Sequence, residues 1–285
     1  MIKSKPVFIT LLVFLLFGTN WAYAQKSEYE TLRKVPYYPD TICKQDKYLA
    51  EQCVMDIYYP KNVKNFATVV WIHGGGLTYG TQQLPELLKN NNICVVGINY
   101  RLHPKVTAPK YIQDAAAAVT WTFRNIAKFG GDTSLIFVSG HSAGAYLSLM
   151  VGLDKHWLAA NNVDANKIAA LIPFSGQTIT HFTIRKERGI GDKQPVVDEY
   201  APLYHIRPDA PPVLLITGDR EMEFIGRYEE NAYLYRMLKL TGNKQVTLHE
   251  LQGYGHDMET PAFPIMLKYI QKYIVDHKNT QVRNE

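Results

Sequence analysis

The stretch LIFVSGHSAGAY, residues 135–146, places one serine midway between two glycines, directly after a run of apolar residues. The run Leu135–Ser139 predicts a buried strand, and the small residues after Ser142 predict the start of a helix. A sharp turn from strand to helix strains its central residue and brings the two elements so close that side chains do not fit two positions away. Gly140 and Gly144 meet that demand, so we interpret Ser142 as a candidate nucleophile.

Outside this stretch, short apolar runs alternate with longer segments of helical periodicity, a pattern typical of a mostly parallel sheet covered by helices. After an opening hairpin around Cys53–Tyr59, we expect strands at Ala67–His73, Ile93–Asn99, Leu135–Ser139, Ala169–Phe174, Val213–Thr217 and Val246–Leu251. The clearest helices are expected at Lys110–Lys128, Arg227–Leu240 and Ala262–Asp276. The sequence therefore predicts the α/β class, with a single domain over residues 25–285.

A proline-rich insertion at about 177–212 interrupts this alternation. Its prolines are Pro195, Pro202, Pro208, Pro211 and Pro212. The insertion connects two expected strands on the side of the sheet where ligands of open α/β sheets bind. Two interpretations remain open, a small cap over a pocket and a surface loop without a role.

The N-terminus has the features of a secretory signal peptide over residues 1–24. Lys3 and Lys5 form a basic start, Val7–Phe17 an apolar core, and Ala22-Tyr23-Ala24 a cleavage site of small residues. No other stretch reaches the roughly 20 apolar residues that span a bilayer, so we expect a secreted or periplasmic product without stable membrane insertion. An uncleaved anchor is the alternative. Cleavage lowers the formal net charge from +5 to +3, which is too little to favour a nucleic-acid partner.

The chain contains three cysteines. Cys94 lies in the apolar run Ile93–Ile98 and is expected in the core. Cys43 and Cys53 flank the expected hairpin and would be able to pair in an oxidising compartment, so this disulfide is left open. A domain of this length buries enough apolar surface to fold without one.

A glycine run, HGGG at residues 73–76, follows the first expected parallel strand. Three successive glycines leave backbone N–H groups open to a cavity. In acyl-transfer enzymes such groups, with the N–H of the residue after the nucleophile, bind the tetrahedral oxyanion. We therefore expect Gly74, Gly75 and Ala143 to form an oxyanion hole, and His73 to be a buried support.

Taken together, these motifs resemble the esterase/lipase branch of the α/β-hydrolase superfamily, close to hormone-sensitive-lipase-like and related secreted carboxylesterases. The resemblance rests on HGGG at 73–76, GINYRLHP at 97–104, DAAAAVTW at 114–121, GHSAG at 140–144, PPVLLITGD at 211–219 and GYGHDME at 253–259. It implies an α/β-hydrolase fold and a serine hydrolase without metal or cofactor. Tyr100, Arg101 and Asp114 are expected to brace the scaffold.

The general base is expected after the last strand, where residues 253–257 place His256 in a glycine-rich loop. The acid is less well defined. The resemblance puts it three positions after Gly218, at Glu221, where the family more often has aspartate, and Asp219 is the alternative. The order of serine, acid and histidine is the hydrolase order under either choice.

Two further histidines are candidates for lining the substrate pocket. His141 precedes the candidate nucleophile, and His181 lies in the insertion. The site as a whole predicts a serine carboxylesterase acting on small-molecule or glycan esters with small or medium acyl groups, acetylated or feruloylated sugars among them. An amidase or peptidase with the same triad is the first alternative. A non-catalytic binding protein is the second, although the sequence keeps every catalytic element.

Overall fold

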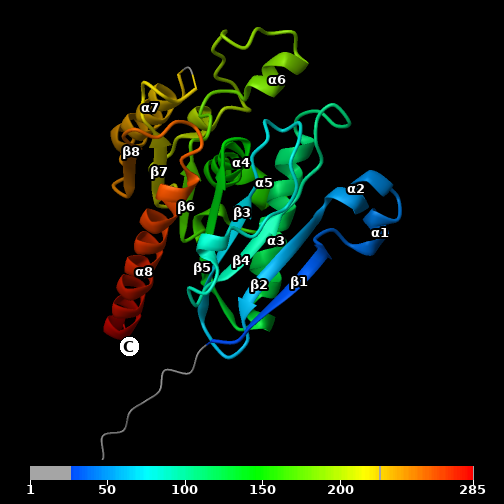
Figure 1. The fold of residues 1–285 in the computed structure, drawn as a ribbon, viewed down its shortest axis with the longest axis vertical. Coiled ribbons are helices and arrows are strands. Elements are labelled where there is room, and N and C mark those ends of the chain that lie inside the picture. Colours follow the sequence, from blue (N-terminus) through cyan, green and yellow to red (C-terminus); the bar gives the residue numbers. More distant parts are fainter. Residues whose placement is uncertain (1–26, 225, 285) are drawn as a thin grey trace, which may run out of the picture.

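The structure, a computed structural model, describes residues 27–224 and 226–284. These residues form an eight-stranded sheet in the order β1-β2-β4-β3-β5-β6-β7-β8 (Figure 1). The strands are β1 Tyr29–Pro36, β2 Val54–Pro60, β3 Phe66–Ile72, β4 Cys94–Ile98, β5 Gly131–His141, β6 Ala170–Phe174, β7 Val213–Gly218 and β8 Val246–Leu251. Strand β2 is antiparallel to both neighbours, and the remaining pairs are parallel. The signal peptide expected at residues 1–24 lies outside the described residues.

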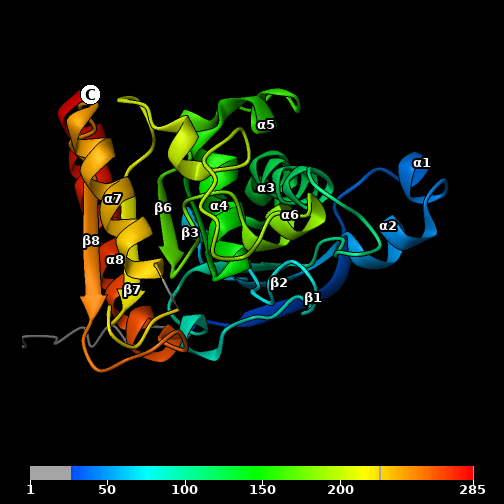
Figure 2. The ribbon, with the colours of Figure 1, turned by 90° about the horizontal axis from the view of Figure 1, so that it is seen from above.

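Helices cover both faces of this sheet. They are α1 Asp40–Cys43, α2 Lys47–Gln52, α3 Lys110–Phe129, α4 Ala143–Leu153, α5 Lys155–Ala159, α6 Phe182–Glu187, α7 Arg227–Leu240 and α8 Glu259–Asn284, with short 3-10 turns at Glu86–Leu88, Ala165–Lys167 and Pro202–His205. Buried residues of α3, α4 and α7 pack on one face, and those of α8 pack on the other. Figure 2 shows β8 and α8 at one end of the molecule and α1 and α2 at the other.

The sequence-based expectation of an α/β fold with a mostly parallel sheet is confirmed. Strand β8 and helix α7 have the expected bounds, and α3 ends one residue later than expected. Helix α8 is longer than expected at both ends, with Pro264 inside it. Within the described part of the chain, no helix is both long enough and apolar enough to cross a membrane.

The N-terminal region differs from the expected opening hairpin. Strand β2 pairs with β1, and the short helices α1 and α2 lie between these strands in the sequence. Helix α2 separates Cys43 from Cys53, and both thiols are free. Burial raises the pKa of the Cys53 thiol, which keeps it protonated. Helices of four and six residues are too short to show a periodicity, which is why the sequence did not reveal them.

A buried ion pair ties the loop after β4 to α3. Arg101 donates from Nη2 to Asp114 at 2.7 Å and from Nε at 2.9 Å, and the Asp114 side chain is 0% exposed. The Tyr38 hydroxyl donates to the same carboxylate at 2.9 Å. Tyr100 donates to the His73 carbonyl oxygen at 3.0 Å. These contacts confirm that Tyr100, Arg101 and Asp114 brace the scaffold.

Replacing Asp114 by alanine is expected to lower the free energy of unfolding by about 3–5 kcal/mol, because it removes the buried carboxylate of Arg101 and leaves this guanidinium with the partly exposed Asp46, at 3.3 Å, as its ionic partner. The matched control is Asp276→Ala, which breaks an ion pair to Lys272 whose partners are 60% and 75% exposed. The control is expected to cost less than about 1 kcal/mol. Urea denaturation of both variants measures the difference, and equal losses would refute the bracing role.

Candidate active site

The residues that carry chemistry lie at one edge of the sheet. Each follows the carboxyl end of a parallel strand: the glycine loop after β3, Ser142 after β5, Ser175 after β6, Glu223 after β7 and His256 after β8. The carboxyl ends of parallel strands meet at the same edge, where ligands of open α/β sheets bind. Distant parts of the sequence are thereby brought to one place.

Ser142 occupies the expected sharp turn between β5 and α4. Its φ of 55° and ψ of −116° are strained for a residue with a side chain, and its N–H donates to the Phe174 carbonyl oxygen at 2.9 Å. A Cβ built on Gly144 would lie 1.9 Å from the Ile72 carbonyl oxygen, and one on Gly140 would lie 2.5 Å from the same atom. Side chains at both positions are therefore excluded by β3, and a Cβ on Gly140 would also lie 2.6 Å from the Gly144 carbonyl carbon, which is the expected close approach of strand and helix.

The glycine loop lies against this turn. A Cβ built on Gly74 would lie 3.4 Å from the Ser142 Cβ. Gly75 has a φ of 104°, and a Cβ there would lie 2.0 Å from the Tyr79 carbonyl oxygen. Ala143 is the first residue of α4, so its N–H lies at the positive end of the helix dipole. The structure thus brings the expected oxyanion donors into one loop cluster around Ser142.

His73 is a buried support, as expected. It is 2% exposed, its ring stacks on Tyr100 with centroids 4.4 Å apart, and its Nε2 lies 3.0 Å from Asn99 Oδ1. Burial lowers the pKa of His73, so its ring is neutral. His73 therefore supports the glycine loop and takes no part in proton transfer.

His256 contacts a buried carboxylate, that of Glu223. Its Nδ1 lies 3.0 Å from Glu223 Oε2 and 3.1 Å from Ser175 Oγ. Ser175 Oγ donates to Glu223 Oε1, which also accepts the Gly218 N–H at 3.1 Å. Because Nδ1 faces a carboxylate, it carries the proton, and Nε2 is left as the basic nitrogen.

The Glu223 carboxylate stays ionised despite its burial. Burial by itself raises the pKa of this group, but hydrogen bonds from His256 and Ser175 outweigh it and hold the pKa at about 2. The side chain is 0% exposed, so solvent screens these bonds little. A negative charge is therefore fixed behind the imidazole.

At the acid, the structure differs from the sequence prediction: Glu223, rather than Glu221 or Asp219, contacts His256. The chain turns back after Asp219, whose carbonyl oxygen accepts the Glu223 N–H at 2.9 Å. The Asp219 carboxylate accepts the N–H groups of Glu221 at 3.0 Å and Gly253 at 2.9 Å. Asp219 therefore joins two loops, and Glu221 is exposed on the turn.

The two other candidate histidines have different surroundings. His141 lies 2.9 Å through Nε2 from the His256 carbonyl oxygen, with ring centroids 4.7 Å apart. Burial and the neighbouring His256 lower the pKa of His141 to about 4, so it donates as a neutral ring. His181 is 1% exposed and accepts the Thr183 N–H at 3.2 Å, and its ring packs on Tyr146. His181 thus caps the start of α6 rather than lining the pocket.

Helix α6 of the insertion at 177–212 packs against the glycine loop, which favours the cap interpretation of this insertion. Thr183 Oγ1 donates to the Gly76 carbonyl oxygen at 2.5 Å, and a Cβ on Gly76 would lie 3.0 Å from Phe182 Cζ. A cavity of about 680 Å³ lies between α6 and the start of α7. Phe224 lines it and stacks on the His256 ring with centroids 4.1 Å apart.

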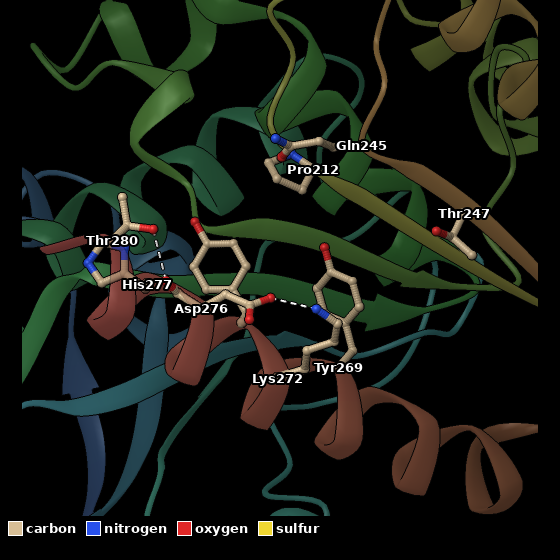
Figure 3. Close-up of a pocket in the computed structure, with 9 residues that line it drawn as sticks. Pro212, Gln245, Thr247, Tyr269, Lys272, Asp276, His277 and Thr280 are labelled. Carbon is tan, nitrogen blue, oxygen red and sulfur yellow. Dashed lines mark hydrogen bonds and ion pairs between the residues drawn. The ribbon is translucent and has the colours of Figure 1, made fainter. Parts of the chain in front are cut away.

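A second cavity lies at the other end of the strands. Figure 3 shows it between α8 and the segments that precede β7 and β8, with Pro212 and Gln245 on one side and Tyr269 and Lys272 on the other. Its volume is about 440 Å³. Because it lies at the amino ends of β7 and β8, it is separate from the candidate active site.

This fold and site define an α/β hydrolase of the esterase/lipase type, as the sequence predicted. The chain belongs to the BD-FAE family, whose model matches residues 55–226. That match includes Ser142 and Glu223, and His256 lies beyond it.

Curated relatives and solved structures agree with this assignment. Esterase LipC from Mycobacterium tuberculosis is 28% identical over 214 residues, which cover 66% of this chain and 51% of LipC. The chain thus spans about half of that relative's length. Carboxylesterase NlhH from the same species is 36% identical over 101 residues, 33% of this chain and 32% of NlhH. A truncated carbohydrate esterase from gut microbiota aligns with a TM-score of 0.70 at 20% identity, over 88% of this chain and 98% of the other.

Proposed function

We propose that this protein is a serine carboxylesterase whose triad is Ser142, His256 and Glu223. The observation that carries the proposal is the 3.0 Å contact from His256 Nδ1 to a buried, ionised carboxylate, at the same edge of the sheet as a serine in a strained strand-to-helix turn. This arrangement leaves the other imidazole nitrogen free to take a proton from the serine.

Acylation begins when Ser142 Oγ attacks the ester carbonyl carbon and its proton moves to His256 Nε2. The tetrahedral oxyanion is stabilised by the N–H groups of Gly74, Gly75 and Ala143, each such donor being worth about 2.7–4 kcal/mol of barrier. The intermediate collapses, the bond to the alcohol oxygen breaks, and the imidazolium returns its proton to the leaving alcohol.

Deacylation repeats these steps with water as the nucleophile. His256 takes a proton from water, the hydroxide attacks the acyl carbon, and Ser142 leaves with the proton that His256 gives back. The Glu223 carboxylate stabilises the imidazolium in both halves. His141 and Ser175 are positioning residues, because they hold the His256 backbone and the Nδ1 edge of its ring.

Esters of sugars with small or medium acyl groups, acetylated or feruloylated, are the proposed substrates. Two aromatic side chains support this class, Tyr79 at 71% exposure just after the glycine loop and Phe224 at 57% beside His256. Exposed aromatic faces of this kind present apolar area to a sugar or aryl ring. The similarity to a carbohydrate esterase agrees with the proposal.

Secretion or a periplasmic location is also proposed, on the signal-peptide pattern of residues 1–24. N-terminal sequencing of protein recovered outside the cytoplasm tests it. We expect a mature chain that begins at Gln25. Recovery of a chain that keeps residues 1–24, in the membrane fraction, would contradict the proposed location.

A series of p-nitrophenyl esters from acetate to palmitate, with the matching anilides, tests the proposed reaction. Each buried methylene contributes about 0.8 kcal/mol to binding until the cavity is full, so kcat/KM is expected to peak between acetyl and octanoyl esters and then to fall. The anilides are expected to react much more slowly. Faster cleavage of the anilides would favour the amidase alternative, and no turnover of any ester would favour a binding protein.

A further inference from the structure

Arg185 is a buried guanidinium that lacks a carboxylate partner within the described residues. It is 3% exposed, and its Nη1 donates to the Gln194 carbonyl oxygen. Its Nε makes no hydrogen bond to any residue that the structure describes. Asp198, in the same insertion, pairs instead with Arg188 at 2.6 Å. A buried charge without compensation is strongly unfavourable, so such a group calls for a ligand.

Arg185 lines the cavity between α6 and α7, and Arg185 and Arg227 are the two buried cations of its wall. Lys193, Asp192 and Glu229 also line the cavity but are exposed. The third acidic residue of the lining, Glu230, is half-buried and accepts the Thr178 N–H at 2.8 Å.

Arg227, the other buried cation of this wall, has no buried nitrogen without a hydrogen bond among the residues described. It donates to the Ser175 carbonyl oxygen and faces the carboxylates of Glu230 and Glu223. Arg185 is therefore the buried cation of the cavity wall whose Nε is left without a hydrogen bond among the residues described.

The cavity adjoins the reaction centre on two sides. Phe182, one helical turn before Arg185, packs against Gly76 of the glycine loop. Phe224, which also lines the cavity, stacks on the His256 ring. A substrate with its ester at Ser142 can therefore extend a second group into the cavity, toward Arg185.

We propose that Arg185 binds a carboxylate carried by the substrate, several bonds from the ester that is cleaved. The Nε–Nη2 edge of a guanidinium matches a carboxylate in a bidentate manner, and Nη1 is already engaged by Gln194. The preferred substrates are thus esters with an acidic group on the alcohol or the acyl side, such as acylated uronic acids. This inference rests on the proposed esterase function.

Two matched ester pairs test the inference by steady-state kinetics. ω-Acetoxyhexanoate and its amide place the charge on the alcohol side, and p-nitrophenyl adipate monoester and its monoamide place it on the acyl side. In at least one pair, the ratio of kcat/KM for the anionic over the neutral ester is expected to fall by about 10- to 100-fold in Arg185→Gln. Arg185→Lys is expected to restore part of it.

Lys186→Gln is the matched control, because it removes the same charge from the next residue, which is exposed. It is expected to leave the ratio unchanged, and all variants are expected to hydrolyse the neutral esters like the wild type. An anionic-to-neutral ratio that Arg185→Gln leaves unchanged in both pairs overturns the inference while the esterase function stands.

Binding gives a readout without turnover. In an NMR titration of Ser142→Ala, hexanoate is expected to bind more tightly than hexanamide, and the added Arg185→Gln change is expected to abolish the difference. Absence of ester hydrolysis together with this binding preference would refute the esterase function alone. Equal binding of the two ligands would refute the role of Arg185.

Discussion

Ser142→Ala is expected to lower kcat for ester hydrolysis by about a million-fold, the size of loss seen when a triad loses its nucleophile. No other group takes over its role, because Ser142 is held at the strained turn beside the glycine loop. KM is expected to change little, since alanine leaves the cavity and the cap intact. Stopped assays with a short-chain p-nitrophenyl ester measure the effect.

The control for this variant is Ser148→Ala, a buried serine of α4 that donates to the Ala145 carbonyl oxygen. It is expected to retain near wild-type kcat, with a loss of stability of about 1 kcal/mol. Ser142→Ala is expected to melt near the wild-type temperature. If a folded Ser142→Ala protein kept more than a hundredth of the activity, another nucleophile would have to be sought.

Glu223→Gln is expected to lower kcat by roughly 10,000-fold. Glutamine has the same size, but it carries no charge to stabilise the imidazolium, and its amide N–H₂ favours the tautomer with the proton on Nε2. That tautomer cannot take the proton from Ser142. Because the change acts on the transition state, kcat and kcat/KM are expected to fall together.

Glu221→Gln provides the matched control, since it removes the same charge two residues away on an exposed turn. Its kcat is expected to stay near that of the wild type. Asp219→Asn keeps one side-chain oxygen and replaces the other by an amide N–H₂ group, so only one of the hydrogen bonds from the Glu221 and Gly253 N–H groups is retained, and the main expected effect is a loss of stability. A large loss in Glu221→Gln with an active Glu223→Gln would restore the original choice of acid.

The sheet was predictable because its parallel strands are buried on both faces and therefore appear as short apolar runs. Residues 67–72 and 94–98 are all buried, and β3 and β4 fall within one residue of the expected bounds. The amphipathic helix α3 was equally clear from its spacing. By contrast, α1, α2 and α6 have four to six residues, too few for any periodicity to stand out.

The serine, the histidine and the glycine loop were predictable because the backbone at or beside each of them needs glycine, and those glycines are visible in the sequence. The acid has no such requirement. Its identity depends on a turn that Asp219 closes, and three carboxylates within the stretch GDREME compete for one place. One available signal was the length of the glutamate side chain, which allows a carboxylate farther along the loop to reach the histidine.

Arg185 was missed for a related reason. Three charged residues follow it directly, so nothing in the stretch HFTIRKER sets it apart from a solvated surface. Only the packing of α6 against the glycine loop shows that this arginine is buried and its neighbour Lys186 is not. Burial in a short cap helix is determined by tertiary contacts rather than by local sequence.

Covalent labelling with a fluorophosphonate tests the central claim most directly. Intact-mass analysis and peptide mapping of the wild-type protein are expected to show one adduct, on Ser142, because a phosphonate is attacked by the activated nucleophile and traps it. Ser142→Ala is expected to stay unlabelled, and Glu223→Gln to label far more slowly than Glu221→Gln. An adduct that persists in Ser142→Ala, or that maps to another residue of the wild type, would contradict the account.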